Sequence, residues 1–108
     1  RIVFVSRVSE LEHKVVASSR ATRNAPLLAG LMERNPSIRV LMHLHREIPP
    51  QADHFVIGDH IFPGTVEEAK LARAFASFPF VLHQPHHGII VGCVDCTQAR
   101  RFLDEHGL

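Results

Sequence analysis

The chain has 108 residues, the size of one domain. Its net charge is +1, with 12 Lys and Arg against 11 Asp and Glu, so it lacks the basic surplus typical of proteins that bind nucleic acid or anionic membranes. Hydrophobic residues make up 45%, which excludes a disordered chain, and no apolar run approaches the ~20 residues of a membrane helix. We expect a soluble cytoplasmic domain with no nucleic-acid or membrane partner.

The sequence opens on Arg1 and enters an apolar, β-branched segment at once, without a Met or a secretory leader. We interpret residues 1–108 as a single domain that lacks its N-terminal part. Its two cysteines are too few for a disulfide scaffold, so the core has to come from apolar packing.

Short strands and short helices follow one another in the first half of the chain. A hairpin is predicted over residues 2–17, where two β-branched segments flank a polar turn. A helix is predicted to begin after Asn24, a favoured N-cap residue, and to stop at Asn35, which precedes a proline. A strand over 38–44 and a proline-containing loop with a short strand at 54–57 come next.

The second half begins with the pattern of a capping box, in which Thr65 and Glu68 satisfy each other's backbone N–H groups. This pattern predicts a helix that runs through Phe75. Two strands and a last amphipathic helix complete the chain, at 80–83, 89–91 and 97–106. The order of these elements predicts an α+β or layered α/β/α domain.

Nine histidines are the outlier in the composition, and histidine is the commonest metal ligand. His43 and His45 are two positions apart near the end of an apolar strand, so their side chains leave the same face. His86 and His87 are rival candidates for a third ligand, just before Gly88, whose missing side chain lets another group approach the backbone. Three neutral imidazoles with an open fourth position are typical of catalytic zinc. We interpret the other histidines as surface or turn residues: His13, His54, His60, His83 and His106.

Four segments resemble, in the same order, segments of the class II aldolase/adducin family. Residues 35–45 are similar to its RPDVxAVVHTH segment and residues 62–68 to its PPGTEEL segment. Residues 80–92 are similar to VLLRNHGVVVVG, and residues 97–103 to the helix that follows it. Several motifs in the right order are more specific than any one of them, and the resemblance covers most of the chain.

This resemblance implies an α/β chain with a layered α/β/α fold, in which short helices flank a central, mostly antiparallel sheet. It also implies a divalent metal, usually zinc, held by His43, His45 and His87. In that family the metal polarises carbonyl and enediolate oxygens of a small sugar phosphate, so that a C–C bond is cleaved or an epimer is formed. The family forms homo-oligomers, commonly tetramers. The expected function is therefore a zinc-dependent, aldolase-type lyase acting on a small sugar phosphate or hydroxy-keto compound.

The chain departs from the family where an acid/base Glu is expected. Asn24 occupies that position, and an amide cannot exchange a proton, although it can cap a helix or hydrogen-bond a substrate oxygen. Glu47, two residues beyond His45, is the first candidate to replace the base, ahead of Asp53 and Asp59. A polar loop supplies the candidate substrate-binding residues Ser19, Thr22 and Arg23.

Two alternatives to an aldolase stay open. The first is a non-catalytic assembly module like the head of adducin, which keeps the fold without the chemistry. The second is a decarboxylase, dehydratase or epimerase that uses the same metal with another acid/base group. The presence of all three histidine ligands favours an enzyme, while the missing Glu leaves the reaction open.

Overall fold

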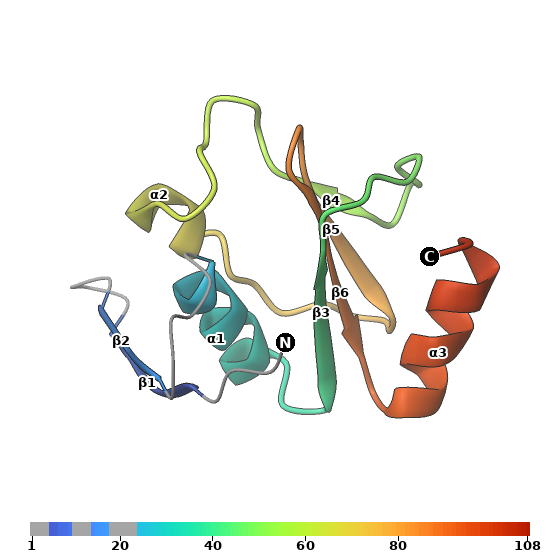
Figure 1. The fold of residues 1–108 in the computed structure, drawn as a ribbon, viewed down its shortest axis with the longest axis horizontal. Helices are drawn as coiled ribbons and strands as arrows, with labels where there is room; N and C mark the ends of the chain where they lie inside the picture. Colours follow the sequence, from blue (N-terminus) through green and yellow to red (C-terminus); the bar gives the residue numbers. More distant parts are fainter. Residues whose placement is uncertain (1–4, 10–13, 18–23) are drawn as a thin grey trace. The chain divides into compact units, whose positions relative to one another are not determined.

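The computed structural model describes residues 5–9, 14–17 and 24–108, and Figure 1 labels their helices and strands. The chain divides into two units. The first is Arg1–Arg34 with Ile61–Ala74, and the second is Asn35–His60 with Phe75–Leu108. Among the described residues, no helix has the length and apolar character needed to cross a membrane.

The first unit contains a two-stranded hairpin and helix α1. Strands β1 (Val5–Ser9) and β2 (Lys14–Ala17) pair antiparallel, which confirms the predicted hairpin over its described part. Helix α1 (Ala25–Arg34) begins directly after Asn24, whose carbonyl oxygen accepts from the N–H of Leu28 at 3.0 Å. Both ends of this helix agree with the prediction.

Helix α2 (Val66–Ala69) is much shorter than the helix predicted to run through Phe75. Thr65 caps its N-terminus by accepting from the N–H of Glu68 at 3.3 Å, as the capping-box pattern predicts. The buried Glu68 carboxylate turns to other partners, because it accepts from the N–H of Gly64 at 3.0 Å and from the side-chain amide of Asn24. The Thr65 cap of the predicted capping box is therefore confirmed, and the Glu68 side chain also ties Gly64 and Asn24 to the start of α2.

The prediction of a longer helix is wrong because tertiary contacts fix Phe75 in another conformation. Its N–H donates to Oδ1 of Asn35 at 2.8 Å, and its ring stacks on Phe80 at 4.2 Å between centroids and 5° between planes. In an α-helix the same N–H would donate to the carbonyl four residues earlier. The contact with Asn35 thus replaces a helical hydrogen bond, and packing overrides the local helix propensity.

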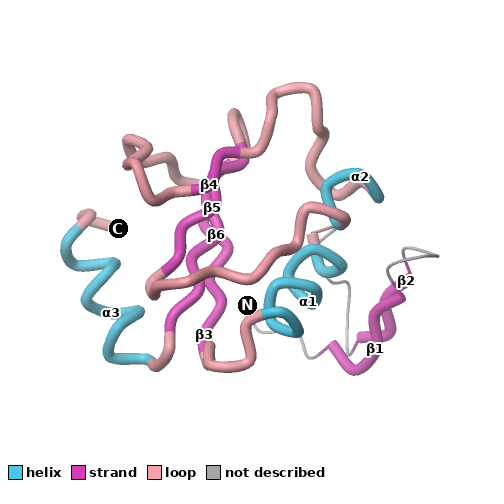
Figure 2. The backbone as a smooth tube through the Cα atoms, turned by 180° about the vertical axis from the view of Figure 1, so that it is seen from behind, coloured by secondary structure: helices cyan, strands magenta, loops and turns pink. Residues whose placement is uncertain are grey.

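The second unit is built on a four-stranded mixed sheet with the order β3-β6-β5-β4. Its strands are β3 (Val40–Leu44), β4 (Phe55–Val56), β5 (Phe80–Gln84) and β6 (Gly88–Cys93). Strand β6 pairs antiparallel with β3 and β5, whereas β4 pairs parallel with β5 at the edge. Figure 2 shows the four strands side by side. The predicted strands are confirmed, with ends that differ by one or two residues.

Helix α3 (Cys96–Glu105) packs on one face of this sheet, against β6 and β3. It begins after Asp95, whose carboxylate accepts from the N–H of Gln98 at 2.7 Å, one residue before the predicted start. The chain leaves the helix at Gly107 with a φ of +66°, as its glycine predicts. Apolar side chains fill the space between helix and sheet: Ile48, Val81, Ile89, Val91, Cys93, Ala99 and Phe102.

The strand register decides which side chains reach which face of the sheet. His43 pairs with Ile90 on β6, and Ile90 pairs in turn with Leu82 on β5. Paired residues project to the same face and neighbours along a strand to opposite faces. His83 therefore projects to the face covered by α3, whereas His43 projects to the other face.

Gly88 allows β6 to start close to β3. Its φ is +153°, and an added Cβ would lie 2.0 Å from the carbonyl oxygen of Leu44 and 3.0 Å from Cα of His45. This confirms that the missing side chain permits a close approach, and the approaching group is the backbone of β3. A side chain at this position would force the two strands apart.

We predict that Gly88→Ala lowers the free energy of unfolding by at least about 2 kcal/mol, because it adds both backbone strain and a steric clash. Gly107→Ala is the matched control, since its φ is also positive but its Cβ would meet nothing within 4 Å. This control should cost about 1 kcal/mol or less. Urea denaturation followed by circular dichroism measures both, and equal losses would contradict the clash with Leu44.

Candidate metal centre

Three histidines converge at one end of the pairing between β3 and β6. His43 is on β3, His45 is the first residue beyond it, and His87 ends the turn that leads into β6. Their ligand atoms all lie within 4.8 Å of one another, and the ring centroids are 5.0 to 5.1 Å apart in each pair. No other group of three such side chains meets this criterion among the described residues.

The turn between β5 and β6 positions His87. The N–H of His87 donates to the carbonyl oxygen of Gln84 at 3.0 Å, which closes the turn. His86 takes a positive φ of 63° in the middle of it, and its N–H donates to the carboxylate of Glu47 at 3.0 Å. Of the two rival histidines, His87 is therefore the one directed to His43 and His45, and His86 is exposed.

The spacing of the imidazoles fits a tetrahedral zinc ion. Bonds of about 2.0 to 2.1 Å at tetrahedral angles place two ligand nitrogens about 3.3 Å apart. The Nε2 atoms of His45 and His87 lie 3.3 Å apart. Nε2 of His43 is buried and has no hydrogen-bond partner, a state that buried polar atoms rarely adopt. A metal ion bound by the three side chains would satisfy this atom.

The surroundings of His43 keep it in the form that binds metal. Burial lowers its pKa from 6.5 to about 4, with further lowering by His87 and His45, while the side chain of Gln84 partly opposes the shift. The imidazole is therefore neutral at neutral pH, as a metal ligand has to be. Gln84 is buried at 2% exposure, and it projects to the same face of the sheet as His43.

The remaining predicted site residues have different surroundings. Glu47 is exposed, and through His86 it holds the turn that carries His87. Asn24 is buried in the first unit, where its amide donates to Glu68, and the three histidines belong to the second unit. Three predicted substrate-binding residues lie outside the described part of the chain: Ser19, Thr22 and Arg23.

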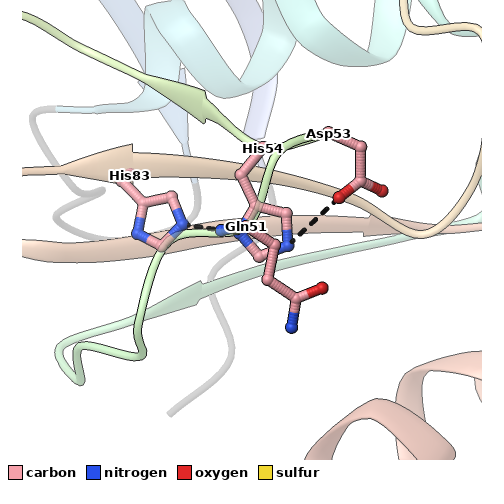
Figure 3. A network of polar contacts seen from close by, with 4 residues as sticks. All are labelled: Gln51, Asp53, His54 and His83. Carbon is pink, nitrogen blue, oxygen red and sulfur yellow. Dashed lines mark hydrogen bonds and ion pairs between the residues drawn. The ribbon is translucent and has the colours of Figure 1, made fainter.

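Apart from this group of three, the structure shows a contacting pair of histidines, His54 and His83, which the sequence did not predict. His83 is only 6% exposed, so its assignment as a surface or turn residue is wrong. Its Nε2 lies 2.8 Å from Nδ1 of His54, and the two rings stack with centroids 5.0 Å apart (Figure 3). The burial of His83 could have been predicted from the alternation of side chains along β5, because His83 is two positions from the core residue Val81 and shares its face.

We predict that this pair makes stability fall as the pH drops below about 6.5. Burial is the main cause that lowers the pKa of both His54 and His83 in the folded chain. The unfolded chain, with ordinary histidine pKa values of about 6.5, then binds more protons than the folded chain, so acid favours unfolding. In His83→Asn, the free energy of unfolding should fall less steeply between pH 7.5 and 5. Urea denaturation in EDTA tests this, and slopes parallel to wild type would contradict it, while His60→Asn serves as an exposed control.

Comparison of the chain with protein families, curated proteins and solved structures finds no match. The function is therefore inferred from the chemistry of the side chains that form the site. Three imidazoles, from the end of β3 and the turn that leads into β6, could hold one metal ion.

We predict that the untagged wild-type chain, incubated with zinc and dialysed, retains about one zinc ion per chain. His43→Ala and His87→Ala should each lose it, because two imidazoles bind zinc much more weakly than three. His60→Ala, an exposed histidine outside the cluster, should retain it. Native mass spectrometry measures the occupancy. A folded wild-type chain without zinc would contradict the metal centre, as would retention in both cluster variants.

Proposed function

We propose that this chain is a zinc-dependent lyase of the aldolase type, acting on a small sugar phosphate or hydroxy-keto compound. The observation that carries the proposal is the convergence of His43, His45 and His87, with a buried Nε2 of His43 that lacks a protein partner. Three neutral nitrogen ligands favour zinc over magnesium or calcium, which prefer oxygen.

The arrangement of the cluster suits catalysis better than a purely structural metal. Structural zinc sites are closed by four protein ligands, whereas catalytic sites use three and keep a position for water or substrate. Here three side chains converge, and His45 is exposed, so solvent has access to the cluster. A zinc ion held there would act as a Lewis acid toward a substrate oxygen.

Glu47 is the acid/base residue of this proposal. Its carboxylate can exchange a proton, and its hydrogen bond to the His86 backbone keeps it beside the turn that carries His87. We assign Asn24 a structural part instead. It directly precedes α1, and its side-chain amide donates to the buried Glu68 carboxylate.

The proposal includes the layered α/β/α architecture of the class II aldolases, a homo-oligomeric assembly such as a tetramer, and a cytoplasmic location. Two observations support the architecture. The sequence motifs of the chain occur in the same order as in that family, and two of the three strand pairings in its mixed sheet are antiparallel. The three histidines and Glu47, which this proposal assigns to catalysis, all belong to the second unit.

We predict zinc-dependent cleavage in a screen of sugar phosphates and hydroxy-keto acids, with product carbonyls detected by a coupled assay. EDTA should abolish turnover, and added zinc should restore it. Glu47→Gln should lower kcat by about 100-fold or more, since it removes the proton-transferring group. Glu67→Gln, an exposed carboxylate on α2, is the matched control and should leave kcat unchanged.

Two outcomes separate the parts of this proposal. Full turnover by Glu47→Gln would remove Glu47 from catalysis while leaving the zinc reaction in place. Silence across the panel from a chain that holds zinc would contradict the lyase and favour a non-catalytic assembly module.

A further inference from the structure

A separate pocket of about 310 Å³ lies in the second unit, beside the C-terminal end of α3. Its volume falls at the lower end of the range for small-molecule sites. The loop around His54, the segment 77–79 and the last turn of α3 line it. None of the three clustered histidines, His43, His45 and His87, lines this pocket. His43 faces the opposite side of the sheet from His83, the partner of His54.

The wall formed by His54 is held in one orientation. The backbone N–H of Gln51 lies 3.3 Å from Nδ1 of His54. Nε2 of His83 lies 2.8 Å from the same nitrogen, so two polar contacts restrain this edge of the ring. As Figure 3 shows, the opposite edge of the His54 ring turns to Asp53, with Nε2 lying 3.9 Å from its carboxylate. The wall is therefore formed before any ligand arrives.

The charge of the lining is negative. Asp53 and Glu105 both line the pocket, and no lysine or arginine does so among the residues that the structure describes. Burial lowers the pKa of His54 and of His83 behind it, so this pair adds no positive charge near pH 7. A cation is attracted to such a pocket, and an anion is repelled.

Aromatic rings complete the lining. Phe78 and His106 border the pocket, and the ring of His106 packs on the buried Phe102 behind it with centroids 4.3 Å apart. Phenyl faces contact apolar groups and also attract cations through their quadrupole. A ligand that matches both properties has a positively charged end and an apolar body.

We propose that this pocket binds a small organic cation, a protonated amine whose ammonium group pairs with Asp53 and Glu105 while its apolar part packs on the rings of Phe78 and His106. An amine fits better than a metal ion, because the lining does not bring three metal-ligating groups together as the histidine cluster does. This site is independent of the proposed lyase, and it survives if that function fails.

The first test uses the wild-type chain with three probes of similar shape: 2-phenylethylammonium, neutral 2-phenylethanol and anionic 3-phenylpropanoate. Isothermal titration near pH 7 should give an affinity for the ammonium about tenfold higher than for the alcohol, because the ion pairs and cation–π contacts add to apolar packing. NMR shifts should centre on Phe78, Phe102 and His106. Equal affinity for the alcohol or the carboxylate would overturn the proposal, as would shifts centred on the metal cluster.

The second test removes the charges one at a time. Asp53→Asn and Glu105→Gln should each weaken ammonium binding about threefold, while binding of the alcohol stays unchanged. The controls are Asp59→Asn and Asp104→Asn, exposed carboxylates that do not line the pocket. Unchanged ammonium binding in both pocket variants would overturn the proposal. Displacement of the ammonium by zinc in the His43→Ala variant would overturn it in favour of a second metal site.

Discussion

The pairing of β3 with β6 is the constraint on which the cluster of His43, His45 and His87 depends. Leu44 pairs with Ile89, so the next position along brings His45 to the level of Gly88. At that point the strands approach so closely that only a glycine fits, and the preceding residue, His87, is carried to the same place. Two histidines from the end of β3 therefore meet a third from the turn of the neighbouring hairpin because of the strand register, without a long loop to position any of them.

The same sheet separates two groups of histidines with different chemistry. Alternation along β5 directs His83 to the α3 face, where it contacts His54 in a hydrogen-bonded pair. The pairing of His43 with Ile90 directs the cluster of His43, His45 and His87 to the other face. Neighbouring residues of β5 thus face different sites. Gln84 projects to the same face as His43, while His83 projects to the α3 face and contacts His54, which lines the pocket beside α3.

The sequence predicts what local rules determine, and it fails where distant contacts decide. Period-two spacing is enough to place His43 and His45 on one face, and caps locate α1 and α3. The choice between His86 and His87 needed the positive φ at His86 and its bond to Glu47, which no spacing rule contains. The prediction of a helix through Phe75 fails because the N–H of Phe75 donates to the side chain of Asn35, 40 residues away in the chain. The predicted ligand set for zinc remains a proposal that the geometry supports.

Burial of His43 couples metal binding to the stability of the sheet. An imidazole nitrogen that is buried without a partner costs roughly 1 to 3 kcal/mol, because it has lost its hydrogen bonds to water. A ligand that binds only the folded chain stabilises it by mass action, and at this nitrogen it would also remove the desolvation cost. The lowered pKa of His43 acts in the same direction, because burial makes protonation of this imidazole less favourable than protonation of an imidazole in water. The chain thus keeps at the end of β3 a nitrogen that neither the protein nor a proton satisfies well, and a metal ion is the partner that can.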